Sequence, residues 1–312
     1  MKVISLNGSS KWRLKKTCAA IGIFDGVHRG HQYLIKQMLT TARRLGAKPV
    51  VITFFPHPAH VLNPDLKLGY LTSLDSRFRL LSDLGVAACL VVRFNRSFAG
   101  IQPQKFIEDI LVKKLGVKAV FVGDDFRFGK DRRGGIALFQ RLGLKYGYEM
   151  HVVSGLKQGR EIISSTRIRQ LVGTGKLNEA ARLLGRSVSV CGAVVKGSER
   201  GKSLGFPTAN IECGSSFILP PRGVYAVKVL LGKKEYSAIA NIGTRPSFGK
   251  QDFKLYLEVH ILDFSKNIYG KCLEVEFLKK IRNEKKFPSP QALIRQIQKD
   301  EVSSRKYFKI SR

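Results

Sequence analysis

The sequence predicts an α/β domain followed by an antiparallel β-barrel. Short apolar runs alternate with amphipathic stretches from residue 17 to about residue 155, and strands that alternate with helices form parallel, doubly wound sheets. After Gly185, β-rich runs follow one another between Gly, Pro and polar turns, which is typical of a barrel. The chain has 312 residues, more than one core usually organises. We therefore predict two domains, residues 1–185 and residues 186–312.

The alternation in the N-terminal domain defines each expected element. Apolar runs predict strands at residues 17–24, 48–55, 87–92, 118–123 and 148–154. Amphipathic stretches predict helices at residues 31–46, 75–85, 103–116 and 136–147, and then at 165–175 and 176–185. In a sheet of this kind, ligands bind beyond the carboxyl ends of the strands.

The C-terminal domain is expected to be a closed or partly closed barrel of six antiparallel strands. The β-rich runs are residues 187–197, 206–213, 223–232, 233–243, 254–264 and 272–281. An amphipathic helix, residues 289–300, follows the last strand, with Ser289 as its N-cap and Pro290 at its first position.

Composition and charge exclude several classes of protein. Lys and Arg number 55 against 23 Asp and Glu, an excess that favours highly charged phosphate substrates or polyanionic partners. The positive charge is spread along the chain, with no zinc-finger spacing or RNP-like aromatic run, so nucleic acid is not expected as the main partner. The apolar runs have strand length, far short of the roughly 20 residues that cross a bilayer. No membrane association is expected.

The cysteines and the first residues indicate a cytoplasmic protein. The five cysteines are widely scattered, with no C-x-x-C pair, which favours reduced thiols over a disulfide framework or a zinc site. Residues 1–16, MKVISLNGSSKWRLKK, place polar and basic residues where a secretory signal needs an unbroken apolar stretch. We therefore do not expect the chain to be exported.

The stretch GIFDGVHRGH, residues 22–31, joins the first predicted strand to the first predicted helix. Backbone N–H groups at such a helix start face an anion, and glycines let a phosphate approach the backbone closely. His28 and His31 can donate hydrogen bonds as charge builds on a transferring phosphoryl group. The residues alone leave two alternatives open: a Gly-rich turn with surface imidazoles, and a His-x-x-His metal pair, for which no further soft ligand is evident.

The sequence H-x-G-H at residues 28–31 resembles the nucleotidylyltransferase superfamily. Three further motifs follow in order: TFFPHP (53–58), VGDDFRFGKDRRGG (122–135) and ISSTRIRQLVGTGKLNEAARLLGR (163–186). Together with GIFDGVHRGH, they resemble the FMN adenylyltransferase module of bacterial bifunctional FAD synthetases. The resemblance implies a Rossmann-like nucleotidylyltransferase domain in which an FMN phosphate oxygen attacks the α-phosphorus of ATP, with Mg²⁺, and expels pyrophosphate.

The same resemblance implies a role for individual residues. His28 and His31 would stabilise the transferring phosphate and the leaving group, and Ser165, Thr166 and Arg169 would hold the ATP phosphates. The resemblance also places four residues in the ATP and flavin pockets: Gly22, Phe24, Asp25 and Asp125.

Each of these motifs also has a purely structural interpretation. Taken alone, SSTRIR is a Ser/Thr N-cap followed by a basic helix face. GDDFRFG is a turn whose aromatic residues cover the edge of a core, with Asp124, Asp125 and Phe126 at its start. In TFFPHP, His57 either approaches the substrate or belongs to a structural loop.

The segment GSERGKSLGFPTANI, residues 197–211, is not a Walker A motif. That motif needs four residues between its first glycine and the Gly-Lys-Ser. The required position holds Lys196, whereas Gly197 leaves only three residues. Pro207 also blocks the helix that should follow. Four segments follow it in order: PRGVYAV (221–227), NIGTRPSFG (241–249), YLEVHILDF (256–264) and IRNEKKF (281–287). Together these segments resemble a riboflavin kinase module.

The riboflavin kinase resemblance implies that Thr208 and Asn210 carry Mg²⁺ and the nucleotide phosphates, as a hydroxyl and an amide oxygen can. It makes Glu258 the general base for attack of the riboflavin 5′-hydroxyl on the γ-phosphate of ATP. It also places four residues in the ATP and flavin sites: Gly205, Phe206, Pro207 and Asn241. Alternation along the strand turns Glu258 away from Leu257 and Val259, toward a site or toward water.

Purely structural interpretations stay open for this module as well. Thr208 and Asn210 fit polar turn residues, and Glu258, His260 and Glu276 fit ordinary surface positions. The sequence departs from the family pattern at two positions, where Ser247 stands for a more frequent Thr and Lys202 for a frequent Arg. Lys lacks the Arg fork, which alters the phosphate geometry that the position offers.

Taken together, the sequence is expected to encode a bifunctional enzyme that phosphorylates riboflavin to FMN and adenylylates FMN to FAD. ATP is the co-substrate of both reactions, with Mg²⁺. One alternative is another nucleotidylyltransferase, of the cytidylyl or pantetheine-phosphate type, which would have no use for the C-terminal module. The other is a nucleic-acid-binding protein with degenerate sites, suggested by the charge of +32. The sequence does not specify an oligomeric state.

Overall fold

A computed structural model describes residues 1–6, 12–66, 68–130, 133–197, 204–213, 217–247 and 250–310. The chain divides into two compact units. The first unit holds Met1–Leu68 and Leu74–Ser164, and the second holds Gly69–Ser73 and Ser165–Arg312. The units therefore divide before the two helices that precede Gly185, whereas the boundary predicted from the sequence follows them.

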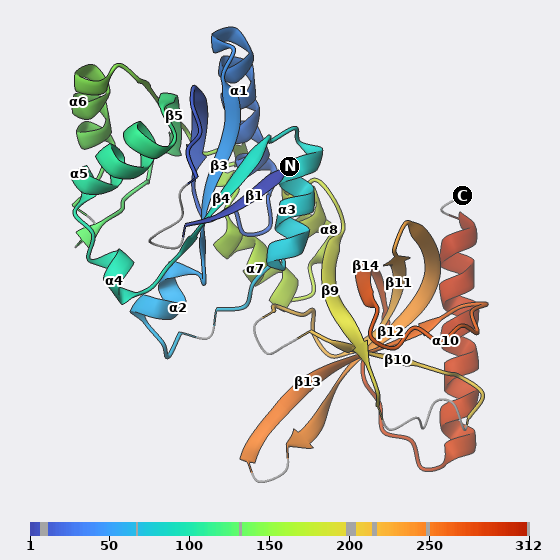
Figure 1. The fold of residues 1–312 in the computed structure, drawn as a ribbon. Coiled ribbons are helices and arrows are strands. Elements are labelled where there is room, and N and C mark those ends of the chain that lie inside the picture. The colour runs from blue at the N-terminus through green and yellow to red at the C-terminus, as the bar shows by residue number, and fades with distance from the viewer. Residues whose placement is uncertain are drawn as a thin grey trace. The chain divides into compact units, whose positions relative to one another are not determined.

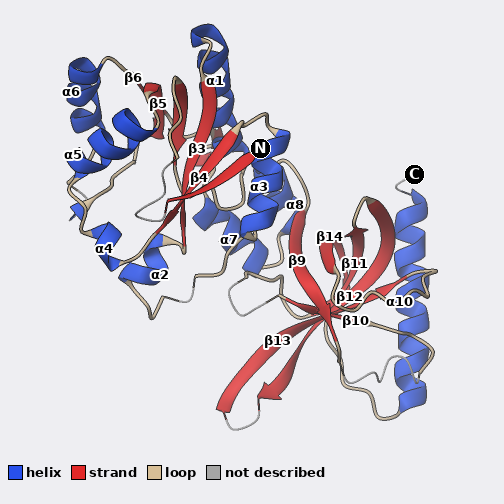
Figure 2. Ribbon diagram, in the orientation of Figure 1, coloured by secondary structure: helices blue, strands red, loops and turns tan. Residues whose placement is uncertain are grey.

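Six parallel strands form the sheet of the first unit (Figure 2). The strands are β1 (Lys2–Leu6), β2 (Thr17–Ile21), β3 (Lys48–Phe55), β4 (Ala88–Arg93), β5 (Val117–Gly123) and β6 (Glu149–Val153). They lie in the order β1-β4-β3-β2-β5-β6, and every neighbouring pair is parallel. From β2 the chain adds β3 and β4 on one side and then crosses to β5 and β6 on the other. The predicted doubly wound sheet is confirmed, and its order reverses between β2 and β5.

Strand β1 is an element that the sequence analysis did not predict. It pairs with β4 at the edge of the sheet, from Lys2 opposite Ala88 to Leu6 opposite Val92. Of its residues only Ile4 is buried, because an edge strand packs few side chains into the core. Its apolar residues Val3, Ile4 and Leu6 are interrupted by Ser5, so the strand lacks the longer apolar run that reveals β3.

Helices cover both faces of the sheet (Figure 1). The helical elements of this unit are α1 (Arg29–Leu45), α2 (Pro58–Leu62), α3 (Leu74–Asp83), α4 (Arg96–Ala99), α5 (Pro103–Phe106), the π-helix η1 (Ile107–Lys114) and α6 (Ile136–Tyr146). Alternate residues of β2 divide two cores: Cys18 and Ala20 pack with α1 and α3, whereas Ala19 and Ile21 pack with α5, η1 and α6. Burial on both faces explains why β2 is a continuous apolar run.

The second unit is a closed antiparallel barrel of six strands, as predicted. The strands are β9 (Val188–Val195), β10 (Ala209–Glu212), β11 (Gly223–Leu231), β12 (Lys234–Ser247), β13 (Lys250–Ile261) and β14 (Cys272–Arg282), in the order β10-β13-β12-β11-β14-β9. Alternate side chains fill the interior, including Leu257 and Val259 of β13 and Ile242 of β12, each at most 1% exposed. The intervening side chains lie on the outside of the barrel.

The helices of the second unit, among its described residues, are α7 (Ser165–Gly173), α8 (Leu177–Leu184) and α10 (Pro290–Ile310). Ser289 caps α10 as predicted, because its hydroxyl accepts a hydrogen bond from the Ala292 N–H at 3.2 Å. The helix then runs past the predicted end at residue 300. A two-stranded hairpin of β7 (Lys157–Gln158) and β8 (Glu161–Ile162) belongs to the first unit.

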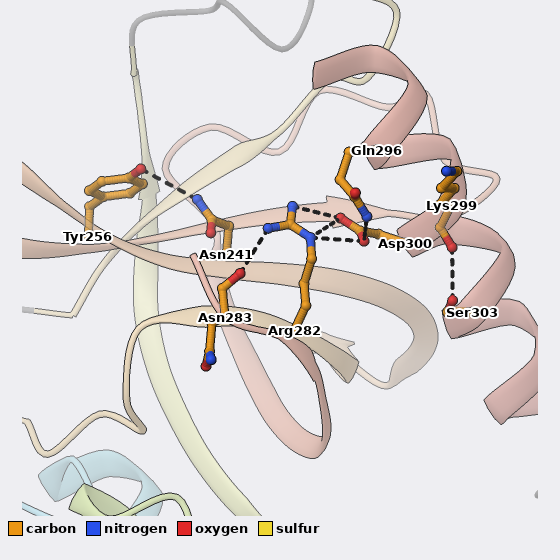
Figure 3. A network of polar contacts seen from close by, with 8 residues as sticks. All are labelled: Asn241, Tyr256, Arg282, Asn283, Gln296, Lys299, Asp300 and Ser303. Carbon is orange, nitrogen blue, oxygen red and sulfur yellow. Dashed lines mark hydrogen bonds and ion pairs between the residues drawn. The ribbon is translucent and has the colours of Figure 1, made fainter. Parts of the chain in front are cut away.

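Arg282, at the end of β14, anchors α10 to the barrel (Figure 3). Its Nε donates to the two carboxylate oxygens of Asp300 at 3.0 and 2.9 Å, and Gln296 donates to the same carboxylate at 2.9 Å. Its Nη1 donates to the carbonyl of Asn283 at 3.0 Å. The Asp300 side chain is only 5% exposed, so its charge is compensated by Arg282 inside the structure.

A short segment from the middle of the first unit's sequence belongs to the second unit. Tyr70 forms an isolated parallel bridge with Phe217, and the Ile218 N–H donates to the Tyr70 carbonyl at 3.0 Å. The Nε of Arg169, in α7, donates to the carbonyl of Gly69 at 2.7 Å. Residues 69–73 therefore belong to the second unit, although the residues on either side of them in the sequence belong to the first.

Candidate active sites

The turn after β2 has an unusual backbone. Predicted to extend to residue 24, the strand ends at Ile21, because the residues that follow leave the extended conformation. Phe24, Gly26 and Val27 have positive φ values of 54°, 81° and 39°. Such values favour glycine, so the two other residues are strained and need support from their surroundings. The Phe24 ring, 1% exposed, is packed into the core below the turn.

The two histidines of this turn lie together at the start of α1. His28 is the N-cap, and its Nδ1 accepts a hydrogen bond from the His31 N–H at 3.3 Å. Because a backbone N–H only donates, the neutral His28 ring carries its proton on Nε2, as a donor. The two rings are stacked, with centroids 3.5 Å apart and planes 18° apart, and the Phe24 ring meets His31 edge-on at 5.1 Å. The turn thus concentrates imidazoles at a helix N-terminus, where anions bind.

Arg77 of α3 supports this turn from below and was not singled out by the sequence analysis. Its Nη1 donates to the Ile23 carbonyl at 3.0 Å, and its Nη2 lies 3.4 Å from the Asp25 carboxylate. The Thr53 hydroxyl donates to the same Ile23 carbonyl at 2.8 Å. The side chains of Arg77 and Asp25 are each 1% exposed. Asp25, predicted to bind ATP or flavin, is thus placed inside the turn as the partner of Arg77.

We expect Arg77→Met to destabilise the first unit by about 3 kcal/mol, because it removes the cation that faces the buried Asp25 carboxylate. Urea unfolding measures the change. The variant should also lose FMN-to-FAD conversion while it keeps riboflavin phosphorylation, since the barrel is untouched. Arg79→Met, at an exposed position of the same helix, is the matched control. Equal stability of the two variants would contradict the assignment.

The third motif combines acidic and aromatic residues after β5. Asp125 is exposed, and the carboxylate of Asp124 accepts a weak hydrogen bond from the Gly155 N–H at 3.4 Å. Phe126 and Phe128 are stacked, with centroids 5.6 Å apart, and both rings contact Phe139 in the core. The aromatic residues therefore cover a core edge, as the structural interpretation of GDDFRFG expects.

The second motif, TFFPHP, forms a short capped loop. The Phe55–Pro56 peptide bond is cis, and His57 is the N-cap of α2, where its Nδ1 accepts from the Ala59 N–H at 3.1 Å. The Nδ1 atom of His57 therefore serves as the cap of α2.

A cavity of about 650 Å³ opens beside the carboxyl end of β6. Tyr33 and Gln37 of α1 line it, with Val153 at the end of β6 and Ser154 and Gly155 after the strand. Phe121 of β5 also lines it, so the hollow lies over β5 and the edge strand β6.

The predicted phosphate-binding residues Ser165, Thr166 and Arg169 belong to α7, in the second unit. The chain approaches them from the first unit, where a Cβ built on Gly30 would lie 3.4 Å from the Ile163 carbonyl oxygen. Ile163, in the first unit, therefore lies beside the histidine turn.

The barrel brings three predicted site residues into one row. Asn210 of β10 lies opposite Glu258 of β13, and Glu258 lies opposite Asn241 of β12. Residues directly opposite each other project from the same face of a sheet. Because Leu257 and Val259 point into the barrel, the row lies on its outer face, as predicted for Glu258. The Asn241 amide also donates to the Tyr256 hydroxyl at 3.4 Å (Figure 3).

The loop before β10 carries the remaining residues that were predicted for the kinase site. Gly205 has a positive φ of 85°, Phe206 and Pro207 contact His260 of β13, and Thr208 directly precedes the strand. A Cβ on Gly197 would lie 2.0 Å from the Asn210 amide nitrogen, so only glycine lets the chain pass this side chain. Lys202 lies outside the described residues.

Two kinds of feature are absent from the described residues. Within the described ranges, no three or more His, Cys, Asp and Glu side chains are arranged to hold a metal ion. The described part of the chain also contains no helix with the length and apolarity that a membrane crossing requires.

The fold and the two residue constellations define a class of enzyme with two phosphate-handling units, a nucleotidylyltransferase-like sheet and a kinase-like barrel. Comparison with known families agrees: the model for FAD synthetase matches residues 10–167, and the model for riboflavin kinase matches residues 184–308. The chain belongs to the family of bifunctional riboflavin kinase/FMN adenylyltransferases. It phosphorylates riboflavin to FMN and adenylylates FMN to FAD, reactions whose ligands are riboflavin, FMN, FAD and ATP.

Individual relatives cover nearly the whole chain. The bifunctional riboflavin kinase/FMN adenylyltransferase of Escherichia coli (strain K12) is 42% identical over 293 residues, which is 94% of this chain and 93% of the relative. That of Listeria monocytogenes is 38% identical over 315 residues, 99% and 98% of the two chains. A crystal structure named macrolide-efflux protein from Streptococcus pneumoniae is 30% identical, with a TM-score of 0.85 over 98% of this chain and 99% of that chain. These matches support neither a cytidylyl-type enzyme nor a nucleic-acid-binding protein.

Proposed function

We propose that FMN adenylylation takes place at the carboxyl ends of β2 and β5, with His28 and His31 as its catalytic residues. The observation that carries this proposal is the stacked pair of imidazoles, 3.5 Å apart, at the N-terminus of α1 and at the reversal of the strand order. As the FMN phosphate oxygen attacks the α-phosphorus, imidazole N–H groups stabilise the charge on the transferring phosphate and on the departing pyrophosphate. Gly22 and Phe24 shape the turn that presents them.

Further residues of the adenylylation site bind and orient. Asp25 keeps the turn in place through Arg77, and Asp125 faces solvent after β5, where it can contact a flavin or a nucleotide. The N-terminus of α7 offers backbone N–H groups, so Ser165 and Thr166 can bind ATP phosphates there, with Arg169 as a cation.

The kinase site occupies the outer row of the barrel. Glu258 accepts the proton of the riboflavin 5′-hydroxyl as its oxygen attacks the γ-phosphorus of ATP. Asn241, beside it in the row, and the loop of Gly205, Phe206 and Pro207 line the flavin and nucleotide sites. The position of Glu258 between two asparagines on one face supports this assignment.

Mg²⁺ is the metal that these donors fit. Thr208 supplies a hydroxyl and Asn210 an amide oxygen, which are hard ligands, and their few side-chain groups suit an ion that keeps waters and substrate phosphates as ligands. When bound, the ion neutralises negative charge on the phosphate oxygens. Thr208 and Asn210 would hold it at the β10 end of the row that contains Glu258.

We assign adenylylation to residues 1–185 and riboflavin phosphorylation to residues 186–312. The limits of the two family matches, which end at residue 167 and begin at residue 184, support this division. The enzyme acts in the cytoplasm, where thiols stay reduced, and the five unbridged cysteines are consistent with that.

The assignment of the metal is tested with the purified chain, riboflavin and ATP, by chromatographic separation of the flavins. With Mg²⁺ we expect FMN and then FAD, and with excess EDTA neither. Thr208→Ala should raise the Mg²⁺ concentration needed for half-maximal FMN formation about tenfold, the effect of one lost ligand or hydrogen bond. The same variant should convert added FMN to FAD at the normal rate. An unchanged Mg²⁺ requirement would overturn the role of Thr208.

A further inference from the structure

The loop that carries the metal-binding hydroxyl is fastened to β13 by a histidine. The Nδ1 atom of His260 lies 2.8 Å from the carbonyl oxygen of Pro207, and the ring of Phe206 meets the imidazole edge-on, with centroids 5.8 Å apart and planes at 74°. The Pro207 carbonyl belongs to the peptide bond whose N–H is that of Thr208. A hydrogen bond to this carbonyl therefore fixes the plane of the peptide that presents Thr208.

The same strand carries the proposed base. Glu258 and His260 are two residues apart on β13, so their side chains project from the same face of the barrel. Asn210, the second proposed metal ligand, lies opposite Glu258 in β10. One strand thus holds the carboxylate that acts on riboflavin and the imidazole that holds the loop of Thr208.

The described part of this loop is attached to β13 at two adjacent residues. Gly205, in the turn before them, has a positive φ of 85°. Phe206 and Pro207 follow, and both contact His260.

We propose that His260 is a positioning residue of the riboflavin kinase, which holds the Gly205–Thr208 loop at a set distance from Glu258. A carbonyl oxygen only accepts, so Nδ1 carries the proton, and the neutral and the protonated ring both supply this donor. His260 then acts through Thr208 and transfers no proton in the reaction. The inference rests on the proposed function of Thr208 and Glu258.

Two variants separate the hydrogen bond from the ring. His260→Phe keeps an aromatic edge against Phe206 and removes the donor. His260→Asn removes the ring but keeps an N–H donor near the position of Nδ1. Tyr236→Leu, which removes an edge-on aromatic pair with Phe264 elsewhere in the barrel, controls for lost packing.

The readouts are steady-state kinetics and a local probe that needs no turnover. In the full-length chain labelled with ¹⁵N-threonine, the amide signal of Thr208 is identified by its loss in Thr208→Ala and is titrated with Mg²⁺·ADP. We expect His260→Phe to shift this signal before ligand is added and to weaken the Mg²⁺·ADP affinity that it reports about tenfold. The KM for ATP in riboflavin phosphorylation should rise by a similar factor, with a smaller change in kcat.

His260→Asn should restore both values to within about threefold, and Tyr236→Leu should leave them unchanged. FMN adenylylation, measured in the same samples, should be unaffected throughout. If His260→Phe leaves the Thr208 titration and KM unchanged, or if Asn rescues neither, His260 does not position the loop. If Thr208→Ala itself leaves the Mg²⁺ requirement unchanged, the proposed metal role fails, a result distinct from failure of the His260 variants alone.

Discussion

Replacing Glu258 by Gln is expected to lower the rate of riboflavin phosphorylation by about 10²–10⁴-fold, the contribution of a positioned general base. Gln has the same shape and can still accept a hydrogen bond, but it cannot take the proton of the riboflavin hydroxyl. The side chain is partly exposed on the outer face of the barrel, so the fold should not depend on its charge. The measurement is the rate of FMN formation from riboflavin, ATP and Mg²⁺.

Two comparisons make this result specific. Conversion of supplied FMN to FAD by the same variant should stay normal. Glu276→Gln is the matched control, because Glu276 is also a glutamate on an outward position of a barrel strand, paired with Lys228 and Ser189. Burial raises the pKa of the Glu276 carboxyl. Glu276 lies outside the Asn210–Glu258–Asn241 row, so its substitution should leave the proposed base in place. If Glu276→Gln impaired phosphorylation as strongly as Glu258→Gln, the assignment of the base would be wrong.

The second large effect is expected in the other unit. His31→Ala should reduce FMN adenylylation by about 10²–10³-fold, the effect of removing one donor that stabilises charge in the transition state. The backbone N–H of the substituted residue can still donate to His28, so the cap of α1 remains. Riboflavin should therefore still be phosphorylated, and FMN should accumulate. The rate of FAD formation from FMN and ATP, with its pyrophosphate product, gives the measure.

His28→Ala separates the roles of the two histidines. It removes both an imidazole and the N-cap acceptor, so it should also cost about 1 kcal/mol of stability, which His31→Ala should not. His60→Ala is the control, because this imidazole belongs to the same unit but not to the turn. Its Nε2 lies 2.7 Å from the carbonyl oxygen of Leu68. Loss of riboflavin phosphorylation in a folded His31→Ala chain would refute the independence of the two sites.

Local patterns in the sequence predict the parts of this structure that depend on neighbouring residues. Alternation predicts the orientation of Glu258, because strand geometry fixes it once Leu257 and Val259 enter the core. The turn of residues 22–31 was predictable for a similar reason, because its glycines and its place between a strand and a helix are local features; its role as a phosphate site stays a prediction. The cap at Ser289 belongs to the same class, whereas the cap at His28 was not predicted.

Contacts between distant residues were not predictable in this way. Arg77 contacts Asp25 across 52 positions of sequence, and in the sequence it is one more basic residue of a basic chain. One signal was available: Arg77 and Leu81 lie one turn apart on the buried side of α3, so the charge falls on an apolar face. Strand β1 and the attachment of residues 69–73 carry no comparable signal, because each is defined by a partner far along the chain.

The attachment of residues 69–73 has a consequence for the order in which the chain can fold. Tyr70 leaves the ribosome long before its partner Phe217, roughly 7–30 s earlier at 5–20 residues per second. During synthesis the first sheet can assemble early, but residues 69–73 can pack in their final place only after the barrel has been synthesised. The two units are therefore interleaved in time as well as in sequence. No single cut of the backbone yields either unit complete. A gene fragment that ends before residue 165 therefore encodes the sheet together with residues 69–73, but not the barrel against which these residues pack.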